Sequence, residues 1–191
     1  MKVIAGDVFL DQPVLIGEYV RLEPLTAAVL GPYLAGLDDP QVQHLTSSQA
    51  RFEPNAVERW LATRQHHHDR ADWAVVRSSD GAFLGEAVLN ELDAPNESVN
   101  YRVWLAGPEA TGRGYGTEVT RLVLSYALND IGLHRVALGV YAFNPRARRV
   151  YEKCGFAVEG RRRDALRWNG SWYDEIMMSV LSTDPRPGNS G

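Results

Sequence analysis

Three glycines alternate with other residues, at positions 112, 114 and 116, in the segment TGRGYGTE, which spans residues 111–118. Because Gly112, Gly114 and Gly116 carry no side chain, the backbone amides beside them can approach an anion closely. The residues that follow have a helical period, and the first turn of a helix directs unpaired N–H groups and the positive end of its dipole to one point. The segment therefore predicts a site for a phosphate or pyrophosphate, to which Arg113 adds positive charge.

Two common nucleotide-binding motifs do not fit this segment. A dinucleotide-binding turn requires G-x-G-x-x-G, but Thr117 stands three residues after Gly114, where the third glycine is needed. A P-loop requires G-x-x-x-x-G-K-[ST]; counted from Gly112, Thr117 takes the place of the second glycine and no lysine follows. A purely structural turn remains the alternative for the segment taken alone.

A second segment with chemical potential is NPRARRVYEKCG, residues 144–155. Asn144 and Tyr151 are seven positions apart, which is about two helical turns or roughly 10 Å of rise, so one helix can contact two parts of an extended ligand. A purely structural role for both residues is also open, because Asn144 is a typical helix cap and Tyr151 shares an apolar face with Val150 and Cys154. We interpret Cys154 as a small buried side chain, not as a nucleophile.

Hydrophobic periodicity and turn residues predict the elements that position these segments. In chain order they are strands within 14–25, a helix from Thr26 to about Leu37, a helix from Asn55 to Asp69, a hairpin of Ala71–Arg77 and Phe83–Leu92, a strand Val99–Leu105, a helix from Thr117 to Gly132, a strand His134–Phe143, a helix from Asn144 to Gly155, and strands Ala157–Arg167 and Ser171–Leu181. The order strand, helix, strand around the glycine-rich segment implies a right-handed parallel crossover.

Composition limits the class of protein. With 191 residues the chain suits one domain, and we expect a leader at 1–13, a single domain at 14–182 and a flexible tail at 183–191. The net charge of −4 argues against nucleic acid or an acidic membrane as a partner, and no apolar run could span a bilayer, so we expect a cytoplasmic protein. With a single cysteine, and with three adjacent histidines at 66–68 that point in different directions on a helix, we expect no metal site.

Together these motifs resemble the GNAT N-acetyltransferase superfamily, whose motif A, R/Q-x-x-G-x-G/A, lies between a strand and a helix. The segment 111–116 fits with Thr111 at the first position, which departs from the family pattern. The wider run from Tyr101 to Leu181, including HRVALGVYAFNPRARRVYEKCGF, is similar to the RimJ/RimL branch. The resemblance implies a single mixed α/β domain with a central, mostly antiparallel mixed sheet, one splayed parallel strand pair, and helices on both faces.

The resemblance also implies acetyl-CoA as the acyl donor. In the family, the glycine-rich turn binds the coenzyme diphosphate, and both the preceding strand and the asparagine of the second helix bind the pantetheine arm. Carried onto this chain, these cofactor-binding roles fall on Val103, Trp104, Leu105, Arg113, Gly114, Tyr115, Gly116, Thr117 and Asn144. We add Arg149 as a contact for the phosphates, although a basic helix face is usually only solvated.

The resemblance further implies catalytic roles. It makes Tyr151 the general acid for the departing thiolate, which is feasible because a phenol with a pKa near 10 is protonated at neutral pH. The acceptor amine needs a base, and some relatives carry a glutamate five residues before the motif asparagine, where this chain has Gly139. Glu91 is our candidate for the base and Glu86 a weaker one; an ordinary exposed carboxylate is the alternative for either.

The function predicted from these residues is direct transfer of an acetyl group from acetyl-CoA to a primary amine, either a protein N-terminus or a small molecule. Gly139 motivates a second hypothesis, a catalytically silent acyl-CoA sensor. A nucleotide-dependent enzyme is a third hypothesis. The sequence leaves open the identity of the acceptor and the oligomeric state, a homodimer included.

Overall fold

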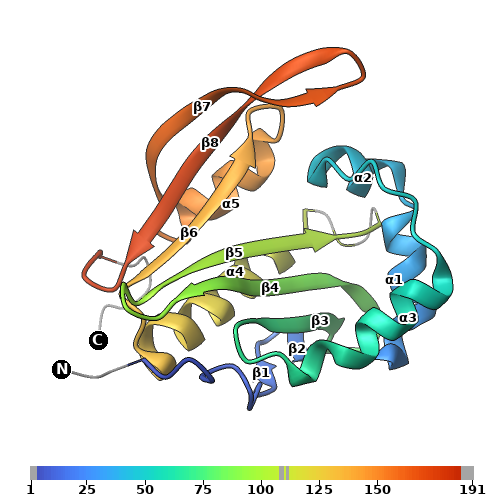
Figure 1. Ribbon diagram of the computed structural model, residues 1–191, viewed down its shortest axis with the longest axis horizontal. Helices are drawn as coiled ribbons and strands as arrows, with labels where there is room; N and C mark the ends of the chain where they lie inside the picture. The colour runs from blue at the N-terminus through green and yellow to red at the C-terminus, as the bar shows by residue number, and fades with distance from the viewer. Residues whose placement is uncertain (1–3, 108–109, 111, 186–191) are drawn as a thin grey trace.

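The computed structural model describes residues 4–107, 110 and 112–185. Among these residues, eight strands form one mixed sheet in the order β1-β2-β3-β4-β5-β6-β8-β7 (Figure 1). The strands are β1 (Leu15–Ile16), β2 (Val20–Pro24), β3 (Ala71–Arg77), β4 (Phe83–Asp93), β5 (Ser98–Leu105), β6 (Arg135–Tyr141), β7 (Ala157–Trp168) and β8 (Ser171–Leu181). The helices are α1 (Leu30–Leu37), α2 (Pro40–Thr46), α3 (Pro54–Thr63), α4 (Tyr115–Ser125) and α5 (Pro145–Lys153).

One pair of neighbouring strands, β5 and β6, is parallel, and the other pairs are antiparallel. The pairing of β5 with β6 runs only from Ser98 opposite Arg135 to Asn100 opposite Ala137. Beyond this point β5 continues to Leu105 and β6 to Tyr141, and Figure 1 shows the two strands diverging. The expected mixed sheet with one splayed parallel pair is therefore confirmed.

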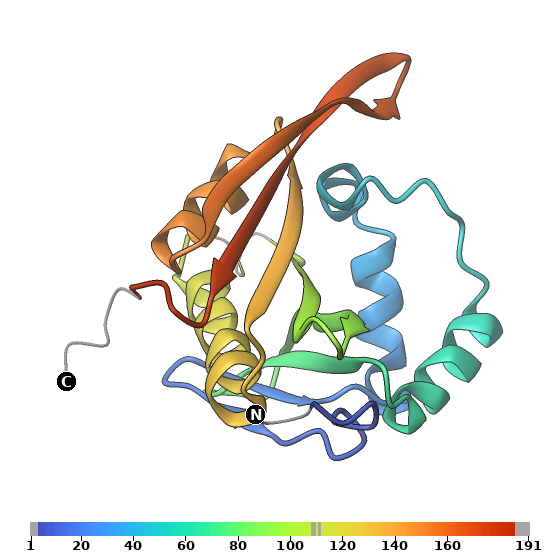
Figure 2. The same ribbon diagram turned by 60° about the vertical axis from the view of Figure 1, so that its left-hand side comes forward.

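Helices cover both faces of the sheet, as expected, and Figure 2 shows α4 and α5 on one side and α1, α2 and α3 on the other. The larger apolar cluster packs with α4 and α5 and includes Trp73, Tyr101 and Leu138. The smaller one packs with α1 and α3 and includes Tyr33 and Leu61. The sheet thus separates two apolar clusters, one on each face.

Most predicted elements are present, and the differences have local causes. The helix after the glycine-rich segment begins at Tyr115, two residues earlier than predicted, because Gly114 takes a left-handed conformation (φ 85°) as its N-cap. The segment predicted as a helix from Asn55 to Asp69 is α-helical over Pro54–Thr63, with Glu53 as its N-cap residue, and continues as a 3₁₀ turn over Arg64–His66. Helix α2 was not predicted, although the Asp39 carboxylate and the proline that follows it form a standard start signal.

The segment expected as a leader contributes to the core. Phe9 is fully buried and Ile4 nearly so, and the Trp73 indole N–H donates to the Pro13 carbonyl at 3.0 Å. In the segment expected as a tail, the Asp184 carboxylate accepts a hydrogen bond from the Leu181 amide at 2.8 Å. The boundaries of the expected leader and tail stay predictions.

Candidate active site

The divergence of β5 from β6 leaves one backbone edge of β5 without a strand partner. On its other edge, Val103, Trp104 and Leu105 pair with Ala87, Glu86 and Gly85 of β4. Toward β6 the ladder stops at Asn100, so the backbone groups of Val103–Leu105 on that side are free to pair with an extended ligand. The strand predicted to hold the pantetheine arm therefore has an open edge at the predicted residues.

The glycine-rich turn lies at the open end of this gap. A Cβ placed on Gly116 would be 3.8 Å from a Leu105 methyl and 3.9 Å from a Val150 methyl, so the first turn of α4 sits between the end of β5 and α5. The Tyr115 side chain is buried in the core, whereas Arg113 is exposed. Thr111 lies outside the described residues.

Helix α5 brings Asn144 and Tyr151 to the same gap. The Asn144 side chain caps the helix by accepting a hydrogen bond from the Ala147 amide at 3.0 Å, which confirms the expected cap. Tyr151 is 7% exposed, and its ring packs edge-on against Tyr101 of β5, with 6.4 Å between centroids. Arg149 is exposed on the same helix.

Burial sets the protonation of Tyr151 on α5 and of Cys154, the C-cap residue of this helix. It raises the pKa of Tyr151 well above that of a free phenol, so the hydroxyl carries its proton at neutral pH. Burial also raises the pKa of Cys154 to about 11, and the thiol points at the Thr117 carbonyl, 3.6 Å away. Cys154 is thus a protonated, buried link between α5 and α4, as interpreted from the sequence.

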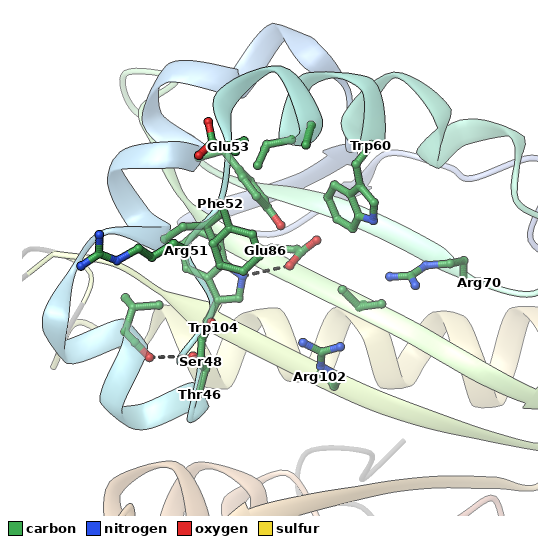
Figure 3. A pocket seen from close by; sticks show the side chains of 16 residues that line it. Thr46, Ser48, Arg51, Phe52, Glu53, Trp60, Arg70, Glu86, Arg102 and Trp104 are labelled. Carbon is green, nitrogen blue, oxygen red and sulfur yellow. Dashed lines mark hydrogen bonds between the residues drawn. The ribbon is translucent and has the colours of Figure 1, made fainter. Parts of the chain in front are cut away.

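A cavity of about 540 Å³ lies on the opposite face of the sheet, between α1, α2, α3 and the strands β4 and β5 (Figure 3). Its walls combine aromatic and charged side chains. The aromatic ones are Tyr33, Phe52, Trp60 and Trp104, and the charged ones are Arg51, Glu53, Arg70, Glu86 and Arg102. Because β5 forms both the floor of this cavity and one side of the gap, the two spaces share a strand.

Glu86 is the buried carboxylate of this cavity. It is 5% exposed; its Oε2 accepts a hydrogen bond from the Trp104 indole at 2.9 Å, and its Oε1 is buried with no partner among the described residues. Burial, and then the nearby charge of Asp72, raise the pKa of Glu86 to about 7, against the opposing effects of the Trp104 hydrogen bond and of Arg102. The group therefore changes charge near neutral pH.

The structure places Glu91 elsewhere. Glu91 is exposed with φ 58° at an irregularity of the β4–β5 pairing between Asn90 and Asp93. That point lies beside Ser98, where β5 and β6 are still paired, so Glu91 stands at the closed end of the gap. Of the two carboxylates considered from the sequence, Glu86 is the one beside the open part of β5.

Gly139 has a neighbour that the sequence did not indicate. It lies on the diverging part of β6, and the Glu175 carboxylate of β8 occupies the space that a Cβ on Gly139 would need. Glu175 is paired with Arg162 at 2.7 Å. A carboxylate is thus present beside the gap at this position, supplied by the neighbouring strand and already neutralised by an arginine.

Comparison with known proteins identifies the family. The family model for the acetyltransferase (GNAT) domain matches residues 20–157, well over half of the chain. The chain belongs to this family. It is an acetyltransferase-family enzyme with the GNAT fold, as the motifs predicted.

Among the relatives of this chain, a putative ribosomal N-acetyltransferase of Bacillus subtilis, YdaF, is 34% identical over 105 residues. A spermidine N(1)-acetyltransferase of Vibrio cholerae is 30% identical over 120 residues. The alignments cover 55% and 62% of this chain, but only 57% of the Bacillus protein and 69% of the Vibrio protein.

Solved structures agree in fold. A crystal structure of spermidine N-acetyltransferase from Vibrio cholerae in complex with CoA and spermine has a TM-score of 0.80 at 22% identity, covering 87% of this chain and 97% of that one. A GCN5-related N-acetyltransferase from Brucella melitensis has a TM-score of 0.74 at 25% identity, covering 90% of this chain and 80% of that one. At these identities the likeness establishes the fold.

In the part of the chain that the structure describes, no three histidine, cysteine, aspartate or glutamate side chains gather as a group that could hold a metal ion. No helix within the described ranges combines the length and apolar character needed to cross a bilayer.

Proposed function

We propose that this chain transfers an acetyl group directly from acetyl-CoA to a primary amine. The observation that carries the proposal is the unpaired edge of β5 at Val103–Leu105, which lies between the glycine-rich turn and Tyr151. An extended pantetheine arm can add to that edge as a strand does, with its phosphates at the N-terminus of α4. The finer assignment to the RimJ/RimL branch is part of this proposal.

The donor is held mainly by backbone groups. The amides of Gly114, Tyr115, Gly116 and Thr117 bind the diphosphate at the start of α4, and Arg113 and Arg149 add positive charge from the surface. Val103, Trp104 and Leu105 hold the pantetheine arm through main-chain hydrogen bonds, and Asn144 contacts the same arm from the start of α5.

When bound, the coenzyme supplies a thioester whose carbonyl carbon is open to attack by an amine. Tyr151 donates its proton to the sulfur as the carbon–sulfur bond breaks, and its burial keeps that proton in place until then. The amine forms the new amide bond after losing a proton. We assign the acceptance of that proton to Glu86, directly or through one water.

Glu86 replaces Glu91 as our candidate base for two reasons. Its side chain lines the cavity beside β5, and its pKa of about 7 suits proton transfer at neutral pH. Glu175 is a poorer candidate because Arg162 already compensates its charge. The cavity is accordingly our proposed acceptor site.

The names of the relatives suggest two acceptors, spermidine and a ribosomal protein. The test is release of free thiol from acetyl-CoA with a panel of small amines, spermidine and peptides with free N-termini. Acetyl-CoA binding by calorimetry, with thiol release for at least one amine, supports the enzyme. Binding without release for any amine would instead favour the acyl-CoA sensor that Gly139 suggested.

The Tyr151 assignment has a matched control in the neighbouring tyrosine. Tyr151→Phe should lower kcat by about 10- to 100-fold, because a general acid is lost, with little change in acetyl-CoA affinity. Tyr101→Phe should leave kcat within a few fold, since its hydroxyl lies 3.2 Å from the Thr120 hydroxyl, inside the core. Equal turnover of Tyr151→Phe and wild type would remove the proposed role.

A further inference from the structure

The charges around the acceptor cavity point to the chemistry of the acceptor. Arg51, Arg70 and Arg102 line the cavity, against Glu53 and Glu86. The three arginines outnumber the two carboxyl groups. This excess of positive charge disfavours a ligand whose only charged groups are amines, because like charges repel. The following inference rests on the proposed function and concerns the acceptor alone.

Arg70 and Arg102 differ in the partners that their guanidinium groups have. The Arg70 guanidinium binds the buried Asp72 carboxylate, with 2.7 Å between Nε and Oδ2. Arg102, by contrast, is exposed at the cavity, and none of the hydrogen bonds or ion pairs between described residues involves its side chain. Arg102 is therefore available to pair with an anion that enters the cavity.

Arg102 is a neighbour of Glu86 on the same face of the sheet. In the β4–β5 pairing, Glu86 faces Trp104 and Val88 faces Arg102, so Glu86 and Arg102 are diagonal neighbours, roughly 7–8 Å apart at the backbone. Figure 3 shows both side chains on the same side of the sheet, in the cavity bordered by Trp60 and Trp104. A hydrogen-bond acceptor and a cation are thus presented side by side.

Four other titratable groups face Glu86, and none of them pairs with Arg102. They come from α1, from the segment after α3, and from β3 and its preceding residue: Tyr33, Arg64, Asp72 and Arg70. Arg64 is engaged with the Trp60 carbonyl at 3.1 Å and lies over the Trp60 ring. Of the cavity arginines, Arg51 and Arg102 make no hydrogen bond or ion pair with another described residue, and Arg102 is the one beside Glu86.

We propose that the acceptor is a small molecule of the amino-acid class, whose amine is bound by Glu86 and whose carboxylate is bound by Arg102. Its side chain lies against Tyr33, Trp60 and Trp104. The amine is then held by the group that removes its proton, and a cavity of about 540 Å³ is of the size that small molecules occupy. A polyamine, which offers no anion to Arg102, is disfavoured.

The test compares amino acids with their amides, which keep the amine and side chain but lack the carboxylate. Phenylalanine, leucine and methionine are each assayed beside the matching amide and beside spermidine, by thiol release from acetyl-CoA. We expect at least one amino acid to exceed its amide in kcat/KM by about 10-fold or more, as a charge-assisted hydrogen bond supplies. The amide has the less basic amine, so a larger fraction of it is unprotonated near neutral pH. Intrinsic reactivity alone would therefore give the amide the higher kcat/KM.

Variants connect that preference to Arg102. Arg102→Gln should reduce the acid-to-amide ratio of kcat/KM to about one, and Arg102→Lys should restore part of it. Arg59→Gln, an exposed position on α3 outside the cavity lining, should leave the ratio unchanged. Circular dichroism and acetyl-CoA binding establish that each variant is folded, and Arg102→Lys tests the charge if Arg102→Gln does not fold.

The outcomes separate this inference from the proposed function. If amides or spermidine are acetylated as well as the amino acids, or if Arg102→Gln keeps the preference, the amino-acid inference is wrong while the acetyltransferase stands. If acetyl-CoA binds but no amine of any class releases thiol, the proposed function itself fails. Acetylation of peptides with free N-termini in preference to all amino acids would also overturn the inference.

Discussion

The two faces of the sheet contribute to the candidate site by different means. On the face covered by α4 and α5, the proposed donor side offers backbone groups, a left-handed glycine and a buried phenol, within apolar packing. On the face covered by α1, α2 and α3, the proposed acceptor side offers charged and aromatic side chains around a cavity. Strand β5 belongs to both, since its open edge faces the gap, while Arg102 and Trp104 face the cavity.

This difference suggests how such an enzyme divides its tasks. Main-chain contacts depend on conformation, so the donor side can bind one coenzyme with few constraints on side chains. Side-chain contacts depend on residue identity, so the acceptor side sets which amine enters. Substitutions on the two faces should therefore have separable effects, on acetyl-CoA affinity for one face and on acceptor turnover for the other.

The largest effect is expected on the acceptor face, from Glu86→Gln. Loss of the base should lower kcat by about 100-fold while acetyl-CoA affinity stays close to wild type. Because the pKa of Glu86 is raised to about 7, the ionised base increases as pH rises, so wild-type activity should climb through pH 7. A Glu86→Gln variant with wild-type turnover and the same pH profile would rule out this role.

The same carboxyl should affect stability with the opposite dependence on pH. The folded-state pKa of Glu86 is raised from 4.5 to about 7, so folding favours the protonated form; its contribution is complete below about pH 4.5 and is lost as pH rises through 7. The corresponding change in the free energy of unfolding is about 3 kcal/mol. Denaturation of Glu86→Gln should lack this change, whereas Glu58→Gln, an exposed control on α3, should retain it.

A smaller effect is expected on the donor face from Gly114→Val. At φ 85° a β-branched side chain is strained by about 1–2 kcal/mol or more, so the turn should shift and acetyl-CoA affinity should fall by about 10-fold. Gly170→Val is a close control, because Gly170 has φ 83° in the β7–β8 turn and also has open space around its Cβ position. Calorimetry should show equal destabilisation of both but weaker binding only for Gly114→Val.

The smallest effect is expected from Glu91→Gln. Because Glu91 is exposed at the closed end of the β5–β6 pair, its substitution should change kcat and KM by less than about twofold. Steady-state assays beside Glu86→Gln compare the two carboxylates directly. A loss in Glu91→Gln equal to that in Glu86→Gln would show that the acceptor approaches from the closed end, and the cavity would lose its assigned role.

The sequence predicted the donor face better than the acceptor face. The Asn144 cap and the helix start near Gly114 are local, because capping and a positive φ depend on a few adjacent residues. On the acceptor face, α2 was missed and α3 was drawn too long. The cavity brings together residues from Tyr33 to Trp104, and no local pattern records that they meet.

The choice between Glu86 and Glu91 shows the same limit. Alternation along a strand assigns side chains to faces, but the positive φ of Glu91 interrupts it, and alternation does not say which end of the strand faces the gap. The position of Gly139 is a parallel case. Its missing side chain is visible in the sequence, whereas the Glu175 carboxylate that takes its space comes from a strand 36 positions later.

By itself, the sequence determined the family, most of the element order and the glycine-rich turn before α4, because each depends on short-range pattern and backbone conformation. Tertiary structure alone decided which carboxylate is buried, which of the cavity arginines are left unpaired, and where a cavity opens. Those properties arise from the packing of helices α1 to α3 on the sheet, which removes Glu86 from water and places Arg102 beside it. Residue types set the possible chemistry, and burial determines which groups carry it out.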